Sequence, residues 1–507
     1  MARLIIVANR VPHPNERGNP RAGGLAIALS DVLVPGSLWF GWSGKRSGKT
    51  STSPRVLVDR GVTYATIDLA EADYNAFYRG FANGTLWPLF HMMPGLMTYR
   101  REDYAGYCTV NRAFAEALAG LVGPDDLIWI HDYQMLTVAA ELRALGLRNR
   151  IGFFLHIPFA PPEIFKILPP AAELLRALSA NDVVGFQTEG DRAVFLACIR
   201  VLLGVVPRAG GEFSIDGHET RAVVTPIGID ADSFSSLSAR AVRRAEAKRL
   251  IESLDGHALM IGVDRLDYTK GLPGRFAAYG RFLAAYPQHK HKISYLQIAA
   301  PTRPEVTHYE ELHNELDHKT GAINGAHSDF DWVPLRYITR TISRTAIAGL
   351  YRVARIGLVT PLRDGMNLVA KEYVAAQNPA SPGVLILSRF AGAADELTEA
   401  LLVNPFDIDE VARAIHFALV MPNDERLARH AALLAKVQSG SAAAYCARFT
   451  GFLAETPAPI PIDSLRRISQ DMKSQVLDPT SARVEMTVAN SCSGLNLTTN
   501  EMQKIKL

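Results

Sequence analysis

The chain has 507 residues, longer than one ordinary domain, so two large domains are expected. Its 54 basic and 51 acidic residues give a net charge of +3, and 48% of all residues are apolar. This balance excludes the strongly basic composition typical of nucleic-acid-binding or membrane-surface proteins. Local charge therefore matters more than the total.

Cysteine usage and the N-terminus favour a soluble cytoplasmic protein. The spacing of the four cysteines, Cys108, Cys198, Cys446 and Cys492, fits neither a zinc site nor a redox pair. A disulfide framework is not expected at this length, and a reducing compartment fits best. The first apolar run is too short for a signal peptide, and no run approaches the roughly 18 apolar residues of a spanning helix.

Short apolar runs alternate with helical stretches along most of the chain, which is typical of doubly wound parallel sheets. A first sheet is expected from residues 4–8, 127–130, 151–155, 182–186 and 222–225. A second is expected from residues 258–263, 292–298, 356–359 and 383–387. Residues 226–230 form the expected crossing, with one exposed helix at 237–253 beyond it. The predicted fold class is α/β, with two Rossmann-like domains facing a central ligand-binding cleft.

The segment 361–372, PLRDGMNLVAKE, follows one of these strands and opens an expected helix at 368–376. A strand, a glycine-containing turn and a helix start together form an anion site, because the first N–H groups lack partners and the dipole favours negative charge. Asp364 and Glu372 add two carboxylates that suit sugar hydroxyls. An ordinary βα unit with solvated acids would give the same pattern, so the segment alone leaves both interpretations open.

A second cationic loop follows the expected strand 258–263. Arg265 and Lys270 would lie at its carboxyl end, where two fixed cations can neutralise a leaving diphosphate. A surface loop with ordinary salt bridges is the alternative. Because this loop and segment 361–372 would open into one cleft, the binding interpretation is favoured.

The first domain offers candidates at the ends of its own strands. Arg10 ends the first strand, and Gly23 and Gly24 permit close approach of the backbone to a ligand. Asp132 could accept hydrogen bonds from sugar hydroxyls, or could simply be a helix N-cap. His156 follows the next strand; a lone histidine is usually structural, but its place beside Asp132 in the sheet favours a role in the site.

Three further candidates are individually weak. Tyr78 and Trp87 could stack on sugars or fill a core, and Arg303 could be a solvated side chain. The chain has no Walker loop, zinc helix, nucleophile elbow or nicotinamide fingerprint.

Together these segments resemble the trehalose-6-phosphate synthases, retaining glycosyltransferases with two Rossmann-like domains of the GT-B type. The resemblance runs from Arg3 to Phe452 and is most specific at residues 38–42, 131–133, 154–159, 264–271 and 360–372. It implies transfer of glucose from a nucleoside diphosphate glucose, UDP-glucose by default, to glucose 6-phosphate. The implied product is α,α-trehalose 6-phosphate.

The resemblance also implies residue roles on the donor side. The implied donor-binding residues are Gly23, Gly24, Arg265, Lys270, Ile342, Asp364, Gly365, Met366, Asn367, Leu368, Val369 and Glu372. Among them, Arg265 and Lys270 would bind the diphosphate, and Glu372 would bind the ribose.

On the acceptor side, the implied binding residues are Arg10, Tyr78, Trp87, Asp132 and Arg303. His156 and Trp87 would frame the two anomeric centres. The implied catalytic set is Asp132, His156, Arg265, Lys270 and Asp364. Retention would proceed without a covalent enzyme intermediate and without a metal or cofactor, because fixed cations stabilise the leaving phosphate.

The expected organisation follows from the same resemblance. Residues 1–228 would bind the acceptor, residues 229–440 the nucleotide-sugar, and residues 441–456 would form a helix crossing back to the first domain. Residues 457–507 form a tail expected to be partly disordered. The expected partners are the two substrates, with no nucleic acid or membrane, in a homodimer or homotetramer.

Two alternatives stay open from the sequence. The first keeps the fold and changes the phosphorylated acceptor, as in a glucosylglycerol-phosphate synthase or a pseudo-glycosyltransferase. The second is a non-catalytic sugar-phosphate sensor. Gln134 and Tyr445 depart from the common family pattern, and neither is expected to touch the chemistry.

Overall fold

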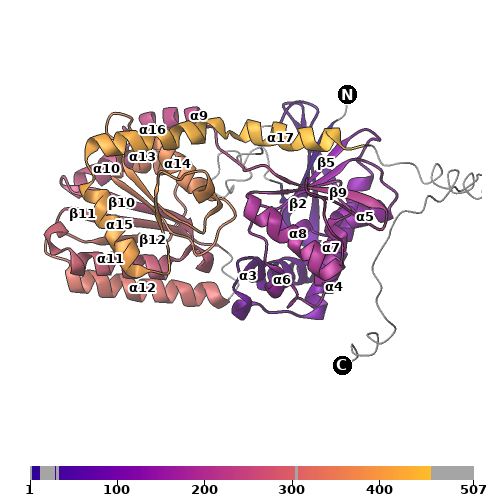
Figure 1. Ribbon diagram of the computed structural model, residues 1–507, viewed down its shortest axis with the longest axis horizontal. Coiled ribbons are helices and arrows are strands. Elements are labelled where there is room, and N and C mark those ends of the chain that lie inside the picture. The colour runs from indigo at the N-terminus through magenta and orange to yellow at the C-terminus, as the bar shows by residue number, and fades with distance from the viewer. Residues whose placement is uncertain (1–2, 12–28, 30–32, 303–306, 458–507) are drawn as a thin grey trace, which may run out of the picture. The chain divides into compact units, whose positions relative to one another are not determined.

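The computed structural model describes residues 3–11, 29, 33–302 and 307–457. Two sheets organise these residues, and both are flanked by helices (Figure 1). Within the described residues, no helix has the length and apolar character needed to cross a membrane.

The first sheet has nine strands in the order β3-β4-β2-β1-β5-β6-β7-β9-β8. Only the edge strands β3 and β8 run antiparallel to their neighbours. The strands are β1 Leu4–Arg10, β2 Leu38–Ser47, β3 Arg55–Asp59, β4 Val62–Ala70, β5 Leu127–His131, β6 Ile151–Phe154, β7 Val183–Phe186, β8 Glu212–Ile215 and β9 His218–Val224.

The second sheet has six parallel strands in the order β12-β11-β10-β13-β14-β15. Numbered from its own first strand, this is 3-2-1-4-5-6, the strand order of a Rossmann sheet. The strands are β10 Ala258–Arg265, β11 Ile293–Ala300, β12 Leu335–Ile338, β13 Ile356–Val359, β14 Val384–Ser388 and β15 Leu401–Val403.

Helices cover both faces of the second sheet. In Figure 1, α11 Leu272–Ala285, α12 Thr307–His327 and α15 Ile408–Val420 lie on one face. The opposite face carries α9 Ala231–Ala241, α10 Ala245–Leu254, α13 Arg344–Val353, α14 Leu368–Ala376 and α16 Asn423–Ser439. The apolar runs of the strands are buried between these two layers.

The helices that accompany the first sheet differ widely in length. They are α2 Glu71–Tyr74, the π-helical segment η2 Asn75–Leu86, α3 Trp87–Phe90, α4 Arg101–Ala119, α5 Val138–Ala144, α6 Pro162–Phe165, α7 Ala171–Leu178 and α8 Glu189–Leu203. Short 3-10 turns are η3 Pro94–Leu96, η4 Tyr133–Met135, η5 Tyr268–Lys270, η6 Pro287–His289 and η7 Gly392–Asp395.

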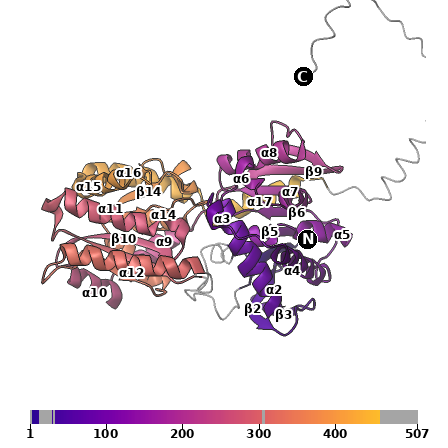
Figure 2. The ribbon, with the colours of Figure 1, turned by 90° about the horizontal axis from the view of Figure 1, so that it is seen from below.

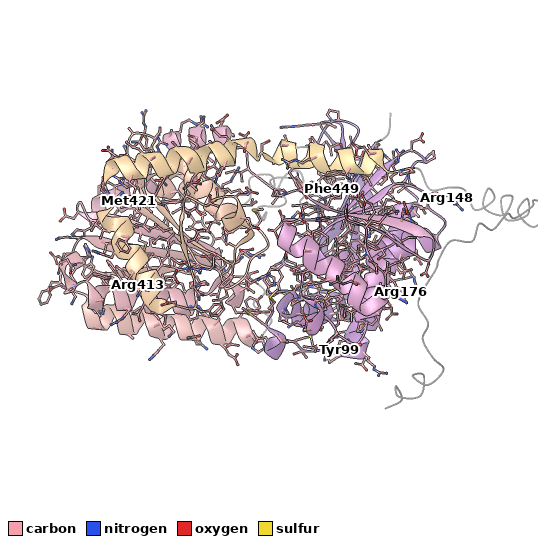
Figure 3. All side chains as sticks on the ribbon, viewed as in Figure 1. Tyr99, Arg148, Arg176, Arg413, Met421 and Phe449 are labelled. Carbon is pink, nitrogen blue, oxygen red and sulfur yellow. The ribbon has the colours of Figure 1, made fainter. Side chains whose placement is uncertain are left out.

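The last described helix, α17 Ala442–Glu455, packs on the first sheet beside β6 (Figure 2). Its Phe449, labelled in Figure 3, stacks on Trp129 with ring centroids 4.7 Å apart. A Cβ added at Gly152 or Gly185 would lie 2.7 or 2.6 Å from the Phe449 ring. Glycine in β6 and β7 therefore makes the space that this ring fills.

All nine strands expected from the apolar runs are present, and six further strands were missed: β2, β3, β4, β8, β12 and β15. The single helix expected at 237–253 is wrong. The chain instead forms α9 and α10, with an extended Arg244 between them. The end of α9 meets α13 closely: a Cβ added at Gly349 would lie 2.9 Å from the Ala241 backbone.

Candidate active site

The predicted site residues gather where the strand order of each sheet reverses. In the first sheet the reversal lies between β1 and β5, where Arg10 ends one strand and Asp132 follows the other. In the second it lies between β10, which ends at Arg265, and β13, which is followed by Asp364. Open α/β sheets bind ligands at these points, outside the carboxyl ends of the strands.

Lys270 and Asp364 form an ion pair at the second sheet, with Nζ and Oδ2 2.5 Å apart. The Asn367 amide donates to the same carboxylate oxygen at 3.1 Å. Burial alone would raise the pKa of Asp364, but Lys270, together with His91 and Asn367, outweighs burial and holds the pKa below its usual value. The carboxylate is therefore ionised, fixed in place and able only to accept hydrogen bonds.

Asn367 also starts the helix that follows. Its backbone has φ +91°, a left-handed conformation uncommon for a residue other than glycine, and its side chain accepts from the Ala370 N–H at 3.1 Å. Leu368 and Val369 occupy the first turn of α14, where the amides have no carbonyl partner within the helix. This helix start has the properties of an anion site.

Glu372, one turn further along α14, faces Arg344 of α13 with Nε and Oε1 3.5 Å apart. Burial raises the pKa of Glu372, and Arg344 opposes that rise. The guanidinium also lies 4.9 Å from the ring centroid of Phe234. Half-buried Ile342 lies two residues before Arg344.

Sequence reasoning missed Arg344, although a signal was present. An arginine at the first position of a helix opposes the helix dipole, so it is retained there for another reason.

Arg275 of α11 is a second residue that sequence reasoning missed. Its fully buried guanidinium pairs with Asp264 at 2.5 Å and donates to Thr360 Oγ1 and Gln297 Oε1, each at 3.0 Å. It also donates to the Lys270 carbonyl at 3.2 Å. Arg275 thus ties together the ends of β10, β11 and β13 and the loop that carries Lys270; only the tertiary structure reveals this role.

Arg265 is exposed and lies over Trp87 of α3, 5.6 Å from the ring centroid. Next to Trp87 lies His91, another residue absent from the sequence predictions. The His91 ring centroid is 4.2 Å from that of Trp87, and Nδ1 is 2.7 Å from the Trp87 carbonyl oxygen. Burial lowers the pKa of His91 to about 4, although the Trp87 carbonyl, Asp267 and Asp364 act in the opposite direction. His91 is therefore neutral near pH 7.

His156 contacts the second sheet's binding loop through its backbone. A Cβ added at Gly365 would lie 2.3 Å from the His156 carbonyl oxygen, so only glycine permits this approach. The His156 N–H donates to Asp132 Oδ1 at 3.2 Å. Asp132 precedes η4 but makes no side-chain cap bond there, and its φ of +75° is strained. Its carboxylate is therefore held beside His156 and not at a helix start.

Both ring nitrogens of His156 are engaged inside the protein. Nε2 lies 3.0 Å from His131 Nδ1, and Nδ1 lies 3.2 Å from Gln187 Nε2. Burial lowers the pKa of His156 to about 3. The ring is thus neutral and already hydrogen-bonded, so it is poorly suited to carry a proton to or from a substrate.

The acceptor-side candidates lie on neighbouring elements. Arg10 pairs in register with Trp42 of β2, and its guanidinium lies against Gly44. The Tyr78 ring centroid is 6.5 Å from that of Trp42 and 5.3 Å from that of Tyr74. Trp42 was part of a recognised motif but was missed as a site residue. Its place beside Arg10 follows from the parallel register of β1 and β2.

Some predicted residues cannot be assessed in the structure, and others lie behind the site. Gly23, Gly24 and Arg303 fall outside the described residues. Met366 is buried under the loop. Tyr445 of α17, with its ring centroid 6.4 Å from that of His156, packs behind that histidine. Across the described part of the chain, no three His, Cys, Asp or Glu side chains are grouped as a metal site would require.

Two Rossmann-like sheets, with an anion-binding helix start on one and a carboxylate-bearing strand end on the other, define a two-domain glycosyltransferase of the GT-B type. The sequence model of glycosyltransferase family 20 matches residues 3–454. The chain belongs to this family.

Known proteins agree with this assignment. A trehalose-6-phosphate synthase of Sinorhizobium fredii (strain NBRC 101917 / NGR234) is 47% identical over 452 residues, which cover 89% of this chain and 97% of the relative. A UDP-forming α,α-trehalose-phosphate synthase of Burkholderia vietnamiensis superposes with a TM-score of 0.87 at 44% identity, covering 90% and 97% of the two chains. The enzyme of Burkholderia xenovorans in complex with glucose 6-phosphate gives 0.86 at 44%, covering 89% and 100%.

Proposed function

We propose that this chain is a retaining glucosyltransferase that makes α,α-trehalose 6-phosphate and UDP from UDP-glucose and glucose 6-phosphate. The observation that carries the proposal is the contact between the donor loop and the first domain. Gly365, next to the Lys270–Asp364 pair, lies against the carbonyl oxygen of His156. The backbone N–H of His156 donates to Asp132. The named relatives are trehalose-6-phosphate synthases, and the two Burkholderia enzymes among them are UDP-forming, which supports the same reaction.

Each donor residue has a role that follows from its charge. Arg265 and Lys270 would stabilise the negative charge that develops on the departing diphosphate. The amides of Leu368 and Val369 would contact its phosphates, and Glu372, oriented by Arg344, would bind the ribose. The ionised Asp364 would accept hydrogen bonds from the transferred glucose.

The chemical step needs no protein nucleophile. The bond from the glucosyl anomeric carbon to the phosphate oxygen breaks, and a bond from that carbon to the acceptor's anomeric oxygen forms on the same face. The acceptor hydroxyl gives its proton to the departing phosphate oxygen. His156 is not assigned this proton, because both of its ring nitrogens already have partners. With fixed cations at the phosphate, the step would proceed without a metal.

The acceptor would bind the first domain. Arg10, Tyr78 and Arg303 would hold its 6-phosphate, and Asp132 would accept from its hydroxyls. Trp87, with Arg265 over its ring, would close the space around the two anomeric centres.

A donor-by-acceptor activity matrix tests the proposed function. Purified chain should release UDP when UDP-glucose and glucose 6-phosphate are both present, and NMR of the product should show two α-linked anomeric protons. Omitting glucose 6-phosphate provides the control for donor hydrolysis. Turnover only with another phosphorylated acceptor would support the first alternative. Calorimetric binding with no turnover on any nucleoside diphosphate glucose would support the sensor.

The remaining predictions on organisation are also proposals. We place the acceptor domain at residues 1–228, the donor domain at 229–440 and the returning helix at 441–456. We further propose a cytoplasmic homodimer or homotetramer, which light scattering coupled to size-exclusion chromatography would test. Within the described residues, Cys108, Cys198 and Cys446 are free thiols, as a reducing compartment requires.

A further inference from the structure

A chain of hydrogen bonds leads from the segment after β9 to His156. The Ile227 N–H donates to Gln187 Oε1 at 2.9 Å. The other end of the Gln187 amide, Nε2, lies 3.2 Å from His156 Nδ1. His156 Nε2 lies 3.0 Å from His131 Nδ1. Ile227, Gln187 and His131 are at most 3% exposed, so bulk water cannot replace these bonds.

This series of hydrogen bonds fixes the position of the ring proton on His156 and on His131. A backbone N–H can only donate, so the Gln187 atom facing Ile227 must be the oxygen, and the NH₂ must face His156. His156 Nδ1 must then accept, which places the proton of the neutral ring on Nε2. That N–H donates to His131 Nδ1, so His131 also carries its proton on Nε2. A protonated, cationic His156 would direct an N–H against the Gln187 NH₂ and is disfavoured.

We propose that Gln187 is a positioning residue that locks His156 in its neutral Nε2–H tautomer. The locked ring fixes the residue whose carbonyl meets Gly365 and whose N–H meets Asp132. Gln187 thereby acts on the transfer site without touching a substrate. The kinetic consequence rests on the proposed function, whereas the tautomer does not.

The orientation of Gln187 is itself tied to the donor domain through Ile227. The Ile227 carbonyl accepts from Lys371 Nζ at 2.9 Å, and Lys371 is the residue of α14 next to Glu372. Lys371 is 1% exposed and pairs with Glu396 at 2.8 Å. The backbone N–H of Ile227 is thus held by Gln187, and its backbone carbonyl is held by Lys371 of α14. Through Ile227, Gln187 has a fixed position relative to helix α14.

The tautomer is directly measurable. Long-range ¹⁵N–¹H NMR on the full chain labelled at histidine distinguishes a protonated from an unprotonated ring nitrogen, and His131→Gln and His156→Gln variants assign the signals. In the parent chain, both histidines should show Nε2–H from pH 5 to pH 8. A His156 signal with the proton on Nδ1, or one that titrates in this range, would overturn the proposal.

Gln187→Glu should change which ring nitrogen of His156 carries the proton. Its carboxylate still accepts from the Ile227 N–H but also accepts from His156 Nδ1–H, so the proton should move to Nδ1 or the ring should become cationic. We expect kcat to fall about tenfold to hundredfold, by analogy with the loss of groups that orient metal-bound histidines, with smaller changes in either KM. We also expect the remaining activity to depend on pH between 5 and 8. An unchanged His156 tautomer in this variant would contradict the proposal.

Gln377 provides a matched control for stability. It is equally buried, and its amide bonds the Tyr351 carbonyl at 2.7 Å and the Gly383 N–H at 2.9 Å, at the far end of α14. Gln187→Leu and Gln377→Leu should both lower Tm, and only Gln187→Leu should lower kcat below the melting range. Equal losses of kcat would mean that Gln187 is structural only. If no variant or parent turns over, the NMR measurement still decides the tautomer.

Discussion

At the scale of single residues, the site holds its charges in one state before any ligand arrives. Lys270 keeps Asp364 ionised, and Arg344 faces a more deeply buried Glu372. Fixed charges of this kind need no reorganisation during reaction, which is the main source of electrostatic stabilisation of a transition state.

Arg265→Ala is expected to lower kcat by about 10²-fold or more, because it removes one stabiliser of the leaving diphosphate. Steady-state UDP release with both substrates saturating measures this loss. Arg281 of α11 forms an exposed pair with Asp409 of α15, so Arg281→Ala is the control and should leave turnover unchanged. Near-normal turnover of Arg265→Ala would refute the assigned role.

Arg275→Ala is expected to act on stability instead. The change leaves Asp264 buried without its partner, and breaking a buried ion pair costs about 3–5 kcal/mol. Urea unfolding followed by circular dichroism measures the difference from the parent. Arg275→Lys should recover only part of it, because an ammonium cannot reproduce the forked contacts to Asp264, Thr360 and Gln297. A stability loss below about 1 kcal/mol would contradict this account.

At the scale of elements, close backbone contacts define where segments meet. A Cβ added at Gly228 would lie only 1.4 Å from the Gly440 carbonyl oxygen. Residue 228 follows the first sheet, and residue 440 precedes the helix that returns to it. The two connecting segments therefore touch each other at a position where no side chain fits.

Gly228→Ala should consequently force the two connections apart, with a marked loss of Tm and of activity. Differential scanning calorimetry and the UDP-release assay measure the two effects. Gly451→Ala in α17 is the matched control, because nothing lies within 4 Å of its added Cβ. Removing a glycine from a helix interior should stabilise it by about 0.5–1 kcal/mol. Equal behaviour of the two variants would show that the connections are not tightly packed.

The elements that sequence reasoning found and missed differ in their surroundings. Central parallel strands such as β10 and β13 are covered on both faces, so they read as unbroken apolar runs. The edge strand β3 is exposed, and its apolar run from Val56 to Val58 has only three residues. Arg336 interrupts the apolar residues of β12, and β15 has only three residues. Their positions depend on pairing with a neighbour and not on their own sequence.

At the scale of the whole molecule, buried neutral histidines make stability depend on pH. Burial lowers the pKa of His91 to about 4 and that of His156 to about 3. Burial and the nearby His156 also hold the pKa of His131 well below its usual value. In the unfolded chain all three would titrate near 6.5, so below that pH the unfolded state binds more protons.

The free energy of unfolding should therefore decrease as the pH falls from about 6.5 toward 4, by up to about 1.4 kcal/mol per pH unit for each histidine. Urea unfolding at a series of pH values measures the slope. His91→Gln should reduce this slope, because a glutamine does not titrate. His257→Gln, at a partly exposed position outside the core, should leave the slope unchanged. A flat profile between pH 6.5 and 4 in the parent chain would contradict the prediction.

The sequence by itself determined the two largely parallel sheets, the family and the segments proposed to bind the donor, because apolar runs, helix starts and charged loop motifs are local in the chain. Only the tertiary structure revealed Arg275 and Gln187, and it placed Arg344 and His91 beside predicted site residues. Their partners are distant in the chain, as from Arg275 to Thr360, 85 positions apart, and no local pattern encodes such pairs. The same reason changes the meaning of His156. Its motif suggested a catalytic ring, whereas Gln187 and His131 occupy both ring nitrogens and leave its backbone to face the site.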